Sequence, residues 1–369
     1  MPRPRIPVRI QPYFGYRSAT RLTLSARALR SRAPLFSPGS IWRALRTIMK
    51  LFASREVAGV EVTLRYEASG KLHESTAATD EERYVRFDLD LADWSLAEQT
   101  AWDIVSLHWH EGDVSASVEG FVLAPAQNAT LGIISDIDDT IIQTGVTGSA
   151  GSVLRNWKRL LATMPEDRQQ VPGADQLYGA LGGGLARSVA ARAAAENRGE
   201  ALPTVSGRPF FYVSSSPWNL YSYLVAFKRR HGLPLGPVAL RDWGLNRATF
   251  GSSSHGAHKR NAIDAILSIY PDMRFVLVGD DTQGDLIAFA EVVADHPGRV
   301  AAVFIRRAGE PANEAEMKAQ HVIEAVGIPF WMGDDYATTQ AFLTQTGLVE
   351  DEAAETLVAA VADGVSPAP

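Results

Sequence analysis

Apolar and polar residues alternate with a period of two through much of the first third of the chain. In VEVTLRY, at positions 60–66, every second residue is apolar and those between are charged or carry a hydroxyl. This period is typical of a strand with one buried and one solvated face. Five segments share it: 22–28, 60–66, 85–91, 105–109 and 114–122. Short alternating strands separated by polar turns predict an all-β, sandwich-like domain before residue 125.

From Pro125 onward, short continuous apolar runs replace the alternation, and each ends in a polar cluster or a loop. The runs are LGIIS at 131–135, PFFYV at 209–213, RFVLV at 274–278 and VAAVFI at 300–305. After the second run, Ser216 and Pro217 form an N-cap and first-position pair ahead of a helical pattern that ends near Gly232. Buried strands alternating with helices predict an α/β fold with a parallel, doubly wound sheet.

A third pattern, SIWRALRTIMKLFA at 40–53, has helical periodicity. Trp42 and Phe52 share an apolar face, whereas Arg43, Arg46 and Lys50 lie on the opposite one. A basic amphipathic helix of this kind can lie in a membrane interface, or it can pack its apolar face on a sheet. The pattern alone leaves both outcomes open, and packing on a sheet is the commoner one in soluble chains.

Charge is distributed unevenly along the 369 residues. Residues 1–55 hold twelve Lys or Arg and no Asp or Glu, which leaves a net charge of −18 on the other 314. A cationic end on an anionic protein favours an anionic partner such as a lipid headgroup layer. We expect no nucleic-acid partner, because the chain has no helix-turn-helix or zinc-finger pattern and no interleaved basic and aromatic residues.

Hydrophobicity and cysteine content limit where the protein can reside and which sites it can form. No run approaches the ~18 apolar residues of a transmembrane helix, and the N-terminal segment lacks the apolar core of a secretory signal. We therefore expect no transmembrane segment and a cytoplasmic protein that can bind peripherally at the inner membrane surface. Without cysteine, the chain can form neither disulfides nor thiolate metal sites.

Two groups of residues are candidates for metal binding. His108, His110, Glu111 and Asp113 lie close together in one strand pattern, but a solvated polar face explains them without a metal. The denser group is DIDDT at 136–140, directly after a buried strand. Carboxylates this close oppose each other's ionisation, so the cluster indicates a bound cation or a reactive group.

These carboxylates have the chemistry for phosphoryl transfer. Two acidic residues two positions apart can serve as nucleophile and proton shuttle. Asp280 or Asp281, together with Asp285, can complete an oxygen shell for Mg²⁺. A hydroxyl after the second strand and Lys259 can hold phosphate oxygens, and the absence of a GxxxxGK[ST] loop disfavours an NTPase.

Taken together, these motifs resemble a known family. SDIDDTI, FFYVSSSPWNLY, LRDWG, HKRNAI and VLVGDDTQGD, with the lysine of HKRNAI opening a helix, are similar to the haloacid dehalogenase superfamily of phosphatases. More closely, residues 128–310 resemble the catalytic domain of the actin-patch-associated phosphatidate phosphatase family, to which lipins are distantly related. The resemblance implies a Rossmann-like α/β fold with a small helical cap insertion.

The resemblance also implies a role for each matching residue. Asp136 would be the nucleophile, and Asp138 would be the general acid and base and bind Mg²⁺ through its carbonyl. Thr140 would orient this pair, Ser214 would contact the phosphoryl group, and Lys259 would offset its charge. The implied Mg²⁺ site comprises Asp136, Asp138, Asp280 and Asp285.

Other nearby residues have plainer interpretations. Asp139 and Asp281 are expected to support the site or cap turns, and Ser215 and Ser216 to shape a turn. Arg241 with Asp242 forms a structural ion pair or contacts substrate. For His255 and His258, contact with an anionic substrate and an exposed loop position both remain open.

Spacing bears on substrate size. The interval from Asp136 to Ser214 is 78 residues, enough for a small cap, and that from Ser214 to Lys259 is only 45. An open site would admit a headgroup still held in a bilayer. We expect a basic, β-rich region at 1–125, a phosphatase domain at 126–348 and an acidic, alanine-rich tail at 349–369.

Three functions are compatible with these observations. The first is a Mg²⁺-dependent phosphatase that acts through an aspartyl-phosphate and converts phosphatidate, or a similar lipid phosphate, to diacylglycerol and phosphate. The second is a phosphatase of the same superfamily acting on soluble phosphomonoesters. The third is a membrane-surface binding protein with a vestigial site, against which the intact acidic and lysine residues argue.

Overall fold

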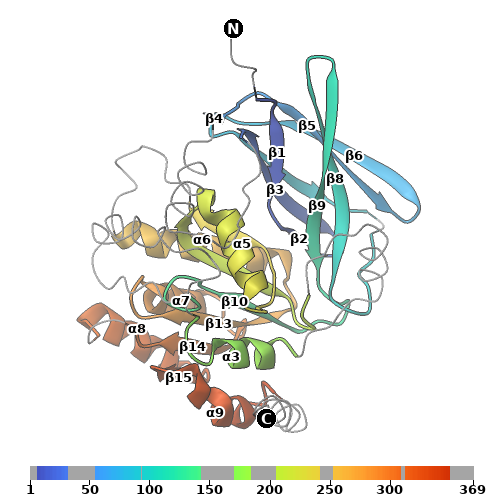
Figure 1. Cartoon of the computed structure of the whole chain (residues 1–369). Coiled ribbons are helices and arrows are strands. Elements are labelled where there is room, and N and C mark those ends of the chain that lie inside the picture. Colours follow the sequence, from blue (N-terminus) through green and yellow to red (C-terminus); the bar gives the residue numbers. More distant parts are fainter. Residues whose placement is uncertain are drawn as a thin grey trace, which may run out of the picture.

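A computed structural model describes residues 6–31, 55–92, 94–142, 170–183, 205–241, 252–308 and 312–349. Figure 1 shows a region of strands at one end of the molecule and a mixed region of helices and strands at the other. The amphipathic helix expected at 40–53, most of the cap insertion and nearly all of the tail lie outside the described residues. Among the helices described, none is both long enough and apolar enough to cross a membrane.

The first region is built from strands. Their bounds are β1 (Arg9–Pro12), β2 (Gly15–Arg17), β3 (Arg21–Arg30), β4 (Arg55–Glu56), β5 (Glu61–Ala68), β6 (Lys71–Ala78), β7 (Tyr84–Asp90), β8 (Ala101–Glu111) and β9 (Val114–Ala124). They form one sheet in the order β1-β3-β2-β9-β8-β5-β6, with β4 and β7 also paired to β3. All pairings are antiparallel except that of β2 with β9.

The alternating positions of these strands build a shared core. Leu22 and Leu24 of β3, Val62 and Leu64 of β5, and Leu107 of β8 are at most 1% exposed and belong to one apolar cluster. The five strands expected from alternation correspond to β3, β5, β7, β8 and β9. The pattern missed β6, which lies at the sheet edge and has no buried residue, so burial imposes no apolar period on it.

The second region contains a six-stranded sheet in the order β12-β11-β10-β13-β14-β15. Every neighbouring pair is parallel, as the sequence predicted. The strands are β10 (Leu131–Ser135), β11 (Phe210–Pro217), β12 (Val238–Arg241), β13 (Arg274–Asp280), β14 (Val300–Arg306) and β15 (Phe330–Gly333). The four apolar runs predicted β10, β11, β13 and β14, whereas the four-residue β12 and β15 at the two edges were missed.

Helices cover both faces of this sheet. Their bounds are α3 (Ala174–Leu181), α5 (Tyr221–Arg230), α6 (Ser252–Ile269), α7 (Asp285–Asp295), α8 (Glu314–Ala325) and α9 (Gln340–Gln345), with short 3₁₀ turns η1 (Trp218–Leu220) and η3 (Tyr336–Thr339). Residues of α3, α5 and α9 join one core cluster, and residues of α6, α7 and α8 join another. The chain leaves β10 toward β11 and later returns to its other side as β13. The carboxyl end of β10 is therefore a topological switch point, where α/β sheets place ligands.

Two local predictions about helix starts were wrong. β11 continues through Ser216 to Pro217, and the following helical turn begins only at Trp218. The tertiary environment overrides the local capping signal, because all eight residues of β11 are buried in the sheet. Lys259 likewise does not open its helix, since α6 already begins at Ser252.

The two regions pack directly on each other. The Phe14 backbone N–H donates to the Tyr221 hydroxyl at 2.8 Å, and the Tyr270 hydroxyl donates to the Arg17 carbonyl at 3.1 Å. Trp102 and Leu123 of the first region are buried in the same apolar cluster as the α6 side of the second. The strand region thus shares a core with the α/β region.

Candidate active site

The switch point gathers polar residues from segments that lie far apart in the sequence. Asp136, Asp138 and Thr140 follow β10, Ser214 and Ser216 lie at the end of β11, and Asp280 is the last residue of β13. Lys259 comes from α6, and Asp285 is the first residue of α7. All seven residues predicted for the site are brought to this one edge, so the placement that the motifs implied is present in the fold.

Three carboxylates form the centre of the site. Asp136, Asp280 and Asp285 each offer one oxygen, and these oxygens lie within 4.8 Å of one another. Their side chains are essentially inaccessible, at 2%, 0% and 0% exposure. Buried oxygens at this spacing suit a hard cation such as Mg²⁺.

Lys259 is the cation that the chain itself supplies to this cluster. Its Nζ lies 3.0 Å from Asp136 Oδ1 and makes a short hydrogen bond to Asp285 Oδ1. The lysine side chain is 1% exposed, so solvent does little to weaken either contact. Lys259 therefore fixes the nucleophile candidate and the start of α7 relative to each other.

Backbone and hydroxyl groups hold the remaining oxygens. Thr140 Oγ1 lies 3.2 Å from Asp136 Oδ2 and 3.0 Å from Asp280 Oδ2, so its proton can serve either. The Asp280 N–H donates to Asp285 Oδ2 at 3.1 Å. Gly279 makes this approach possible, because a Cβ there would lie 2.7 Å from the Asp285 Cβ. The glycine of the GDD motif is thus required by close packing.

Asp138 lies apart from the three-carboxylate group and is held by serines. Ser214 Oγ and Ser216 Oγ donate to its Oδ2 at 2.8 and 2.7 Å, and the Ser216 N–H donates back to Ser214 Oγ at 2.9 Å. The role of Ser216 was missed from the sequence. Strand alternation gives the signal: if β11 runs through to 217, residues 214 and 216 point to one face.

Burial shifts the ionisation of these groups. It raises the pKa of Asp136 well above its ordinary value, and the Lys259 ammonium partly offsets this rise. Burial and the Asp285 carboxylate raise the pKa of Asp280 to about 7. Burial lowers the pKa of Lys259, but the carboxylates of Asp136 and Asp285 outweigh it and raise that pKa overall. The lysine is therefore charged at neutral pH.

The pKa of Asp138 is set by a different environment, in which burial and hydrogen bonds from serines oppose each other. Burial raises its pKa, whereas the hydroxyl hydrogen bonds from Ser216 and Ser214 lower it. Both serines bond the same oxygen, Oδ2, so Oδ1 is the atom that can carry a proton. A carboxyl whose pKa is raised, so that it can hold a proton to donate, is the arrangement expected of a general acid.

Charge balance supports a bound cation. Three buried carboxylates meet here, with the partly buried Asp138 beside them. Among the described residues, Lys259 is the positive side chain that pairs with this group, through Asp136 and Asp285. Asp136 Oδ1 also lacks a hydrogen bond of good geometry within this part of the chain. Oxygen donors, excess negative charge and burial fit Mg²⁺. Coordination by the Asp138 carbonyl remains a prediction.

Neighbouring residues mostly shape the loops. Asp139 has a left-handed φ of 58°, and its carbonyl accepts from Arg306 Nη1 at 2.6 Å. Asp281 Oδ1 accepts the Ala308 N–H at 2.8 Å, and Arg241 is buried at the end of β12. His258 lies within α6, so its alternative placement in an exposed loop was wrong; burial and then Arg241 lower its pKa. Asp242 lies outside the described residues.

The histidine-containing group of the strand region forms no converging cluster. His108 contacts Ser106 Oγ at 2.9 Å, and His110 contacts Ser115 Oγ at 3.1 Å. Glu111 accepts the Val8 N–H at 2.7 Å. Within the described ranges, Asp136, Asp280 and Asp285 are the only group of three potential ligands that meets at one point.

Comparisons with known proteins converge on the segment that contains this site. Residues 131–307 match the family model described as "Phosphatidate phosphatase APP1, catalytic domain". A segment of 198 residues is 28% identical to "Phosphatidate phosphatase APP1" of Saccharomyces cerevisiae and covers 53% of this chain and 29% of that protein. An uncharacterized protein of Schizosaccharomyces pombe is 27% identical over 178 residues, which cover 48% of this chain and 25% of the relative. The matched segments thus span less than a third of either relative.

Solved structures add little. A Parabacteroides merdae β-glucuronidase aligns with 89% of this chain and 47% of its own, at 9% identity and a TM-score of 0.27. A likeness at that score supports no conclusion about fold or function.

Proposed function

We propose that the chain hydrolyses phosphatidate, or a closely similar lipid phosphate, to diacylglycerol and inorganic phosphate, because residues 131–307 match the phosphatidate phosphatase APP1 catalytic-domain family. The observation that carries the proposal is the buried convergence of Asp136, Asp280, Asp285 and Lys259 beside Asp138. We further propose that the α/β region has a haloacid dehalogenase fold with a small cap. The strand region before residue 125 is then a sandwich-like domain that packs on it.

The first half of the proposed reaction uses the two aspartates of the DIDDT motif. A carboxylate oxygen of Asp136 forms a bond to phosphorus, while the bond from phosphorus to the glycerol oxygen breaks. The proton on Asp138 passes to that leaving oxygen, so diacylglycerol departs neutral. Thr140 and Lys259, placed against opposite oxygens of Asp136, keep its carboxylate oriented during the attack.

The second half regenerates the enzyme. Asp138, now ionised, takes a proton from water, and the resulting hydroxide attacks the phospho-aspartate. The bond between Asp136 and phosphorus breaks, phosphate leaves, and Asp138 is again protonated. Ser214 and Ser216 hold Asp138 Oδ2 in place through both steps.

Asp136, Asp280 and Asp285 would hold Mg²⁺, with the Asp138 carbonyl as a further oxygen. When bound, the ion would stabilise negative charge on the phosphoryl oxygens. The cationic residues before position 55 would draw the protein to an anionic lipid surface, where the substrate lies.

The test is phosphate release from phosphatidate vesicles, measured with Mg²⁺ and with chelator, beside a panel of soluble sugar and nucleotide phosphates. We expect Mg²⁺-dependent release from vesicles, and none from Asp136→Asn. Release that survives chelation or Asp136→Asn would disprove the mechanism. A preference for the soluble esters would instead support the soluble-phosphatase alternative.

A further inference from the structure

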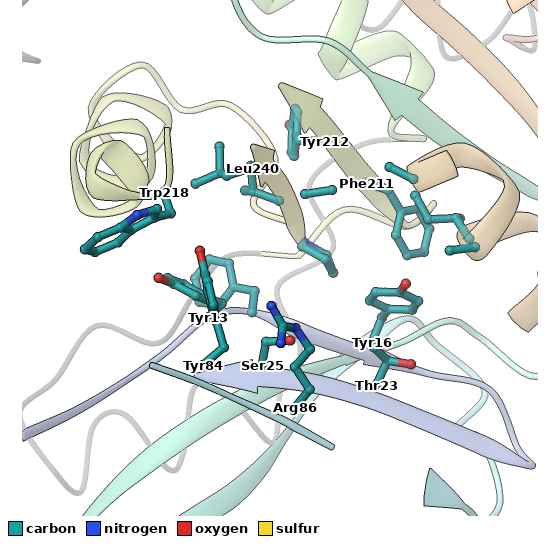
Figure 2. Close-up of a pocket in the computed structure, with 17 residues that line it drawn as sticks. Tyr13, Tyr16, Thr23, Ser25, Tyr84, Arg86, Phe211, Tyr212, Trp218 and Leu240 are labelled. Atoms are coloured by element: carbon teal, nitrogen blue, oxygen red, sulfur yellow. The ribbon is translucent and has the colours of Figure 1, made fainter. Parts of the chain in front are cut away.

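A crevice lies between the strand region and the α/β region (Figure 2). Strand β12 and helix α6 form one wall, which is lined by Val238, Leu240, Ala262 and Ile266. The opposite wall comes from the strand region and carries aromatic and hydroxyl side chains, among them Tyr13, Tyr16, Ser25 and Tyr84, together with Arg86, which forms an ion pair with Asp80 (Figure 2). The crevice therefore has one wholly apolar wall and one mixed wall.

The apolar wall lies along β12, the last strand of the parallel sheet among the described residues. This strand pairs only with β11 among the described strands. Its residues 238–240 are only partly buried, although their side chains are apolar. Apolar surface left accessible beside a cavity is the usual lining of a site for an apolar ligand.

The crevice adjoins the catalytic residues through shared strands. Leu240 is the register partner of Ser214, which donates to Asp138. Trp218 also lines the crevice, and it follows Ser216 by two residues. A molecule lying along β12 would thus have one end near the carboxyl edge of the sheet, where the phosphate would react.

The end of the crevice at Trp218 is rigid. The Arg27 guanidinium lies 3.3 Å from the Trp218 ring centroid and 4.2 Å from that of Tyr84. Arg27 is only 3% exposed, so this cation links the strand region to the segment after the catalytic serines. The two walls are thereby held at a fixed separation.

The volume of the crevice limits the size of the ligand that it can bind. The cavity measures about 280 Å³. That is close to the lower end of the ~300–1,000 Å³ found for small-molecule sites, and roughly twice the ~150 Å³ apolar cavity that accepts benzene. The space suits a segment of a flexible hydrocarbon chain better than a bulky polar group.

We propose that this crevice binds an acyl chain of the lipid phosphate whose headgroup occupies the carboxylate site. The proposal rests on the proposed function, since it supplies the hydrophobic half of the same substrate. The apolar wall of β12 and α6 would contact the methylene groups, and the hydroxyl groups of the opposite wall would face the polar end of the chain.

The first test compares chain lengths. Ala262→Phe places a ring in the crevice, and Ala265→Trp does so from an exposed position at its mouth, where folding is not at risk. We expect the ratio of kcat/KM for dioleoyl phosphatidate to that for dibutyryl phosphatidate to fall about tenfold, the equivalent of losing roughly two buried methylenes. The matched control Ala315→Trp, on an exposed face of α8, should keep the wild-type ratio. An unchanged ratio in both crevice variants would overturn the proposal.

The second test needs no turnover. A brominated long-chain alkyl phosphate, added as monomers, should quench the fluorescence of Trp218, and Trp218→Phe should remove that share of the quenching. Ala262→Phe should weaken it, and Ala315→Phe should not. If wild-type protein hydrolyses neither phosphatidate, the proposed function fails while this measurement still decides on the crevice. Equal quenching in wild type, Trp218→Phe and Ala262→Phe would rule out the acyl-chain site.

Discussion

Replacing Lys259 by methionine tests whether the buried acidic cluster depends on this one cation. The substitution keeps much of the side-chain volume but removes the ammonium group that lies 3.0 Å from Asp136 and contacts Asp285. Breaking a buried ion pair costs about 3–5 kcal/mol, because the remaining charge is left without compensation. We expect a loss of this size in the free energy of unfolding, measured by urea titration at pH 8 with chelator.

The stability contributed by the acidic cluster depends on pH. Burial raises the pKa of Asp280 from 3.8 to about 7, so the folded state holds its proton more tightly than the unfolded state. Stability from this group is fully present below pH 3.8 and is lost as the pH rises toward 7, a change on the order of 4 kcal/mol. Without Lys259 the carboxyl pKa values rise further, so the loss in the variant should shrink as the pH falls to about 5. Mg²⁺ at pH 8 should also reduce the stability loss of Lys259→Met, because the ion neutralises the same carboxylates.

Lys228 provides the matched control in the same domain. It is also fully buried, but its Nζ has no hydrogen-bond partner among the described residues and lies 3.5 Å from the centroid of the Tyr212 ring. Burial lowers the pKa of Lys228 well below its ordinary value. Lys228→Met should therefore be neutral or stabilising, and Mg²⁺ should not change its effect. An equal loss in both variants, independent of pH and Mg²⁺, would refute the charge-balance reasoning and leave only a packing defect.

Three further predictions concern individual contacts of the site. Ser216→Ala removes a hydroxyl donor from the ionised form of Asp138, so the pKa of Asp138 rises. The alkaline limb of the kcat/KM profile against pH should then move up by about one pH unit. Ser215→Ala, on the opposite face of β11, should leave that limb in place. Gly279→Ala forces a Cβ to within 2.7 Å of Asp285, the first residue of α7, and should cost about 1–3 kcal/mol of stability. Mg²⁺ binding, measured by calorimetry, should weaken as well. Unchanged binding would mean that the loop relaxes freely. Thr140→Val leaves two carboxylates without a shared donor, so kcat should fall about tenfold while the fold, checked by circular dichroism, persists.

The sequence predicted the parallel sheet well, because its central strands are buried on both faces. β10 and β13 consist almost entirely of apolar residues with little or no exposure. A continuous apolar run in the sequence predicts a strand of this kind. The site followed from the same pattern, since polar residues placed directly after such strands must meet at one edge of the sheet. That reasoning brought Asp136 and Asp280 together across 144 positions.

The remaining features depend on contacts that local patterns do not encode. The serines of β11 look like a helix cap, and only their hydrogen bonds to the Asp138 carboxylate explain why the strand continues through them. Edge strands β6 and β12 are short or partly exposed, so burial leaves no strong period in them. The crevice between the two regions could not be predicted, because it depends on how Arg27 and Trp218 fix their separation.

The strand order around β10 has a consequence for how the protein matures. The candidate nucleophile is made early in the chain, but Lys259, Asp280 and Asp285 follow it by more than 120 positions. Contacts of such high sequence separation form late in folding, because the intervening loop must close first. A nascent chain that stops before α6 would carry the DIDDT motif without its neutralising lysine or its partner carboxylates. The ability to bind the cation would then arise together with the completed sheet, so metal binding would report on whether folding is finished.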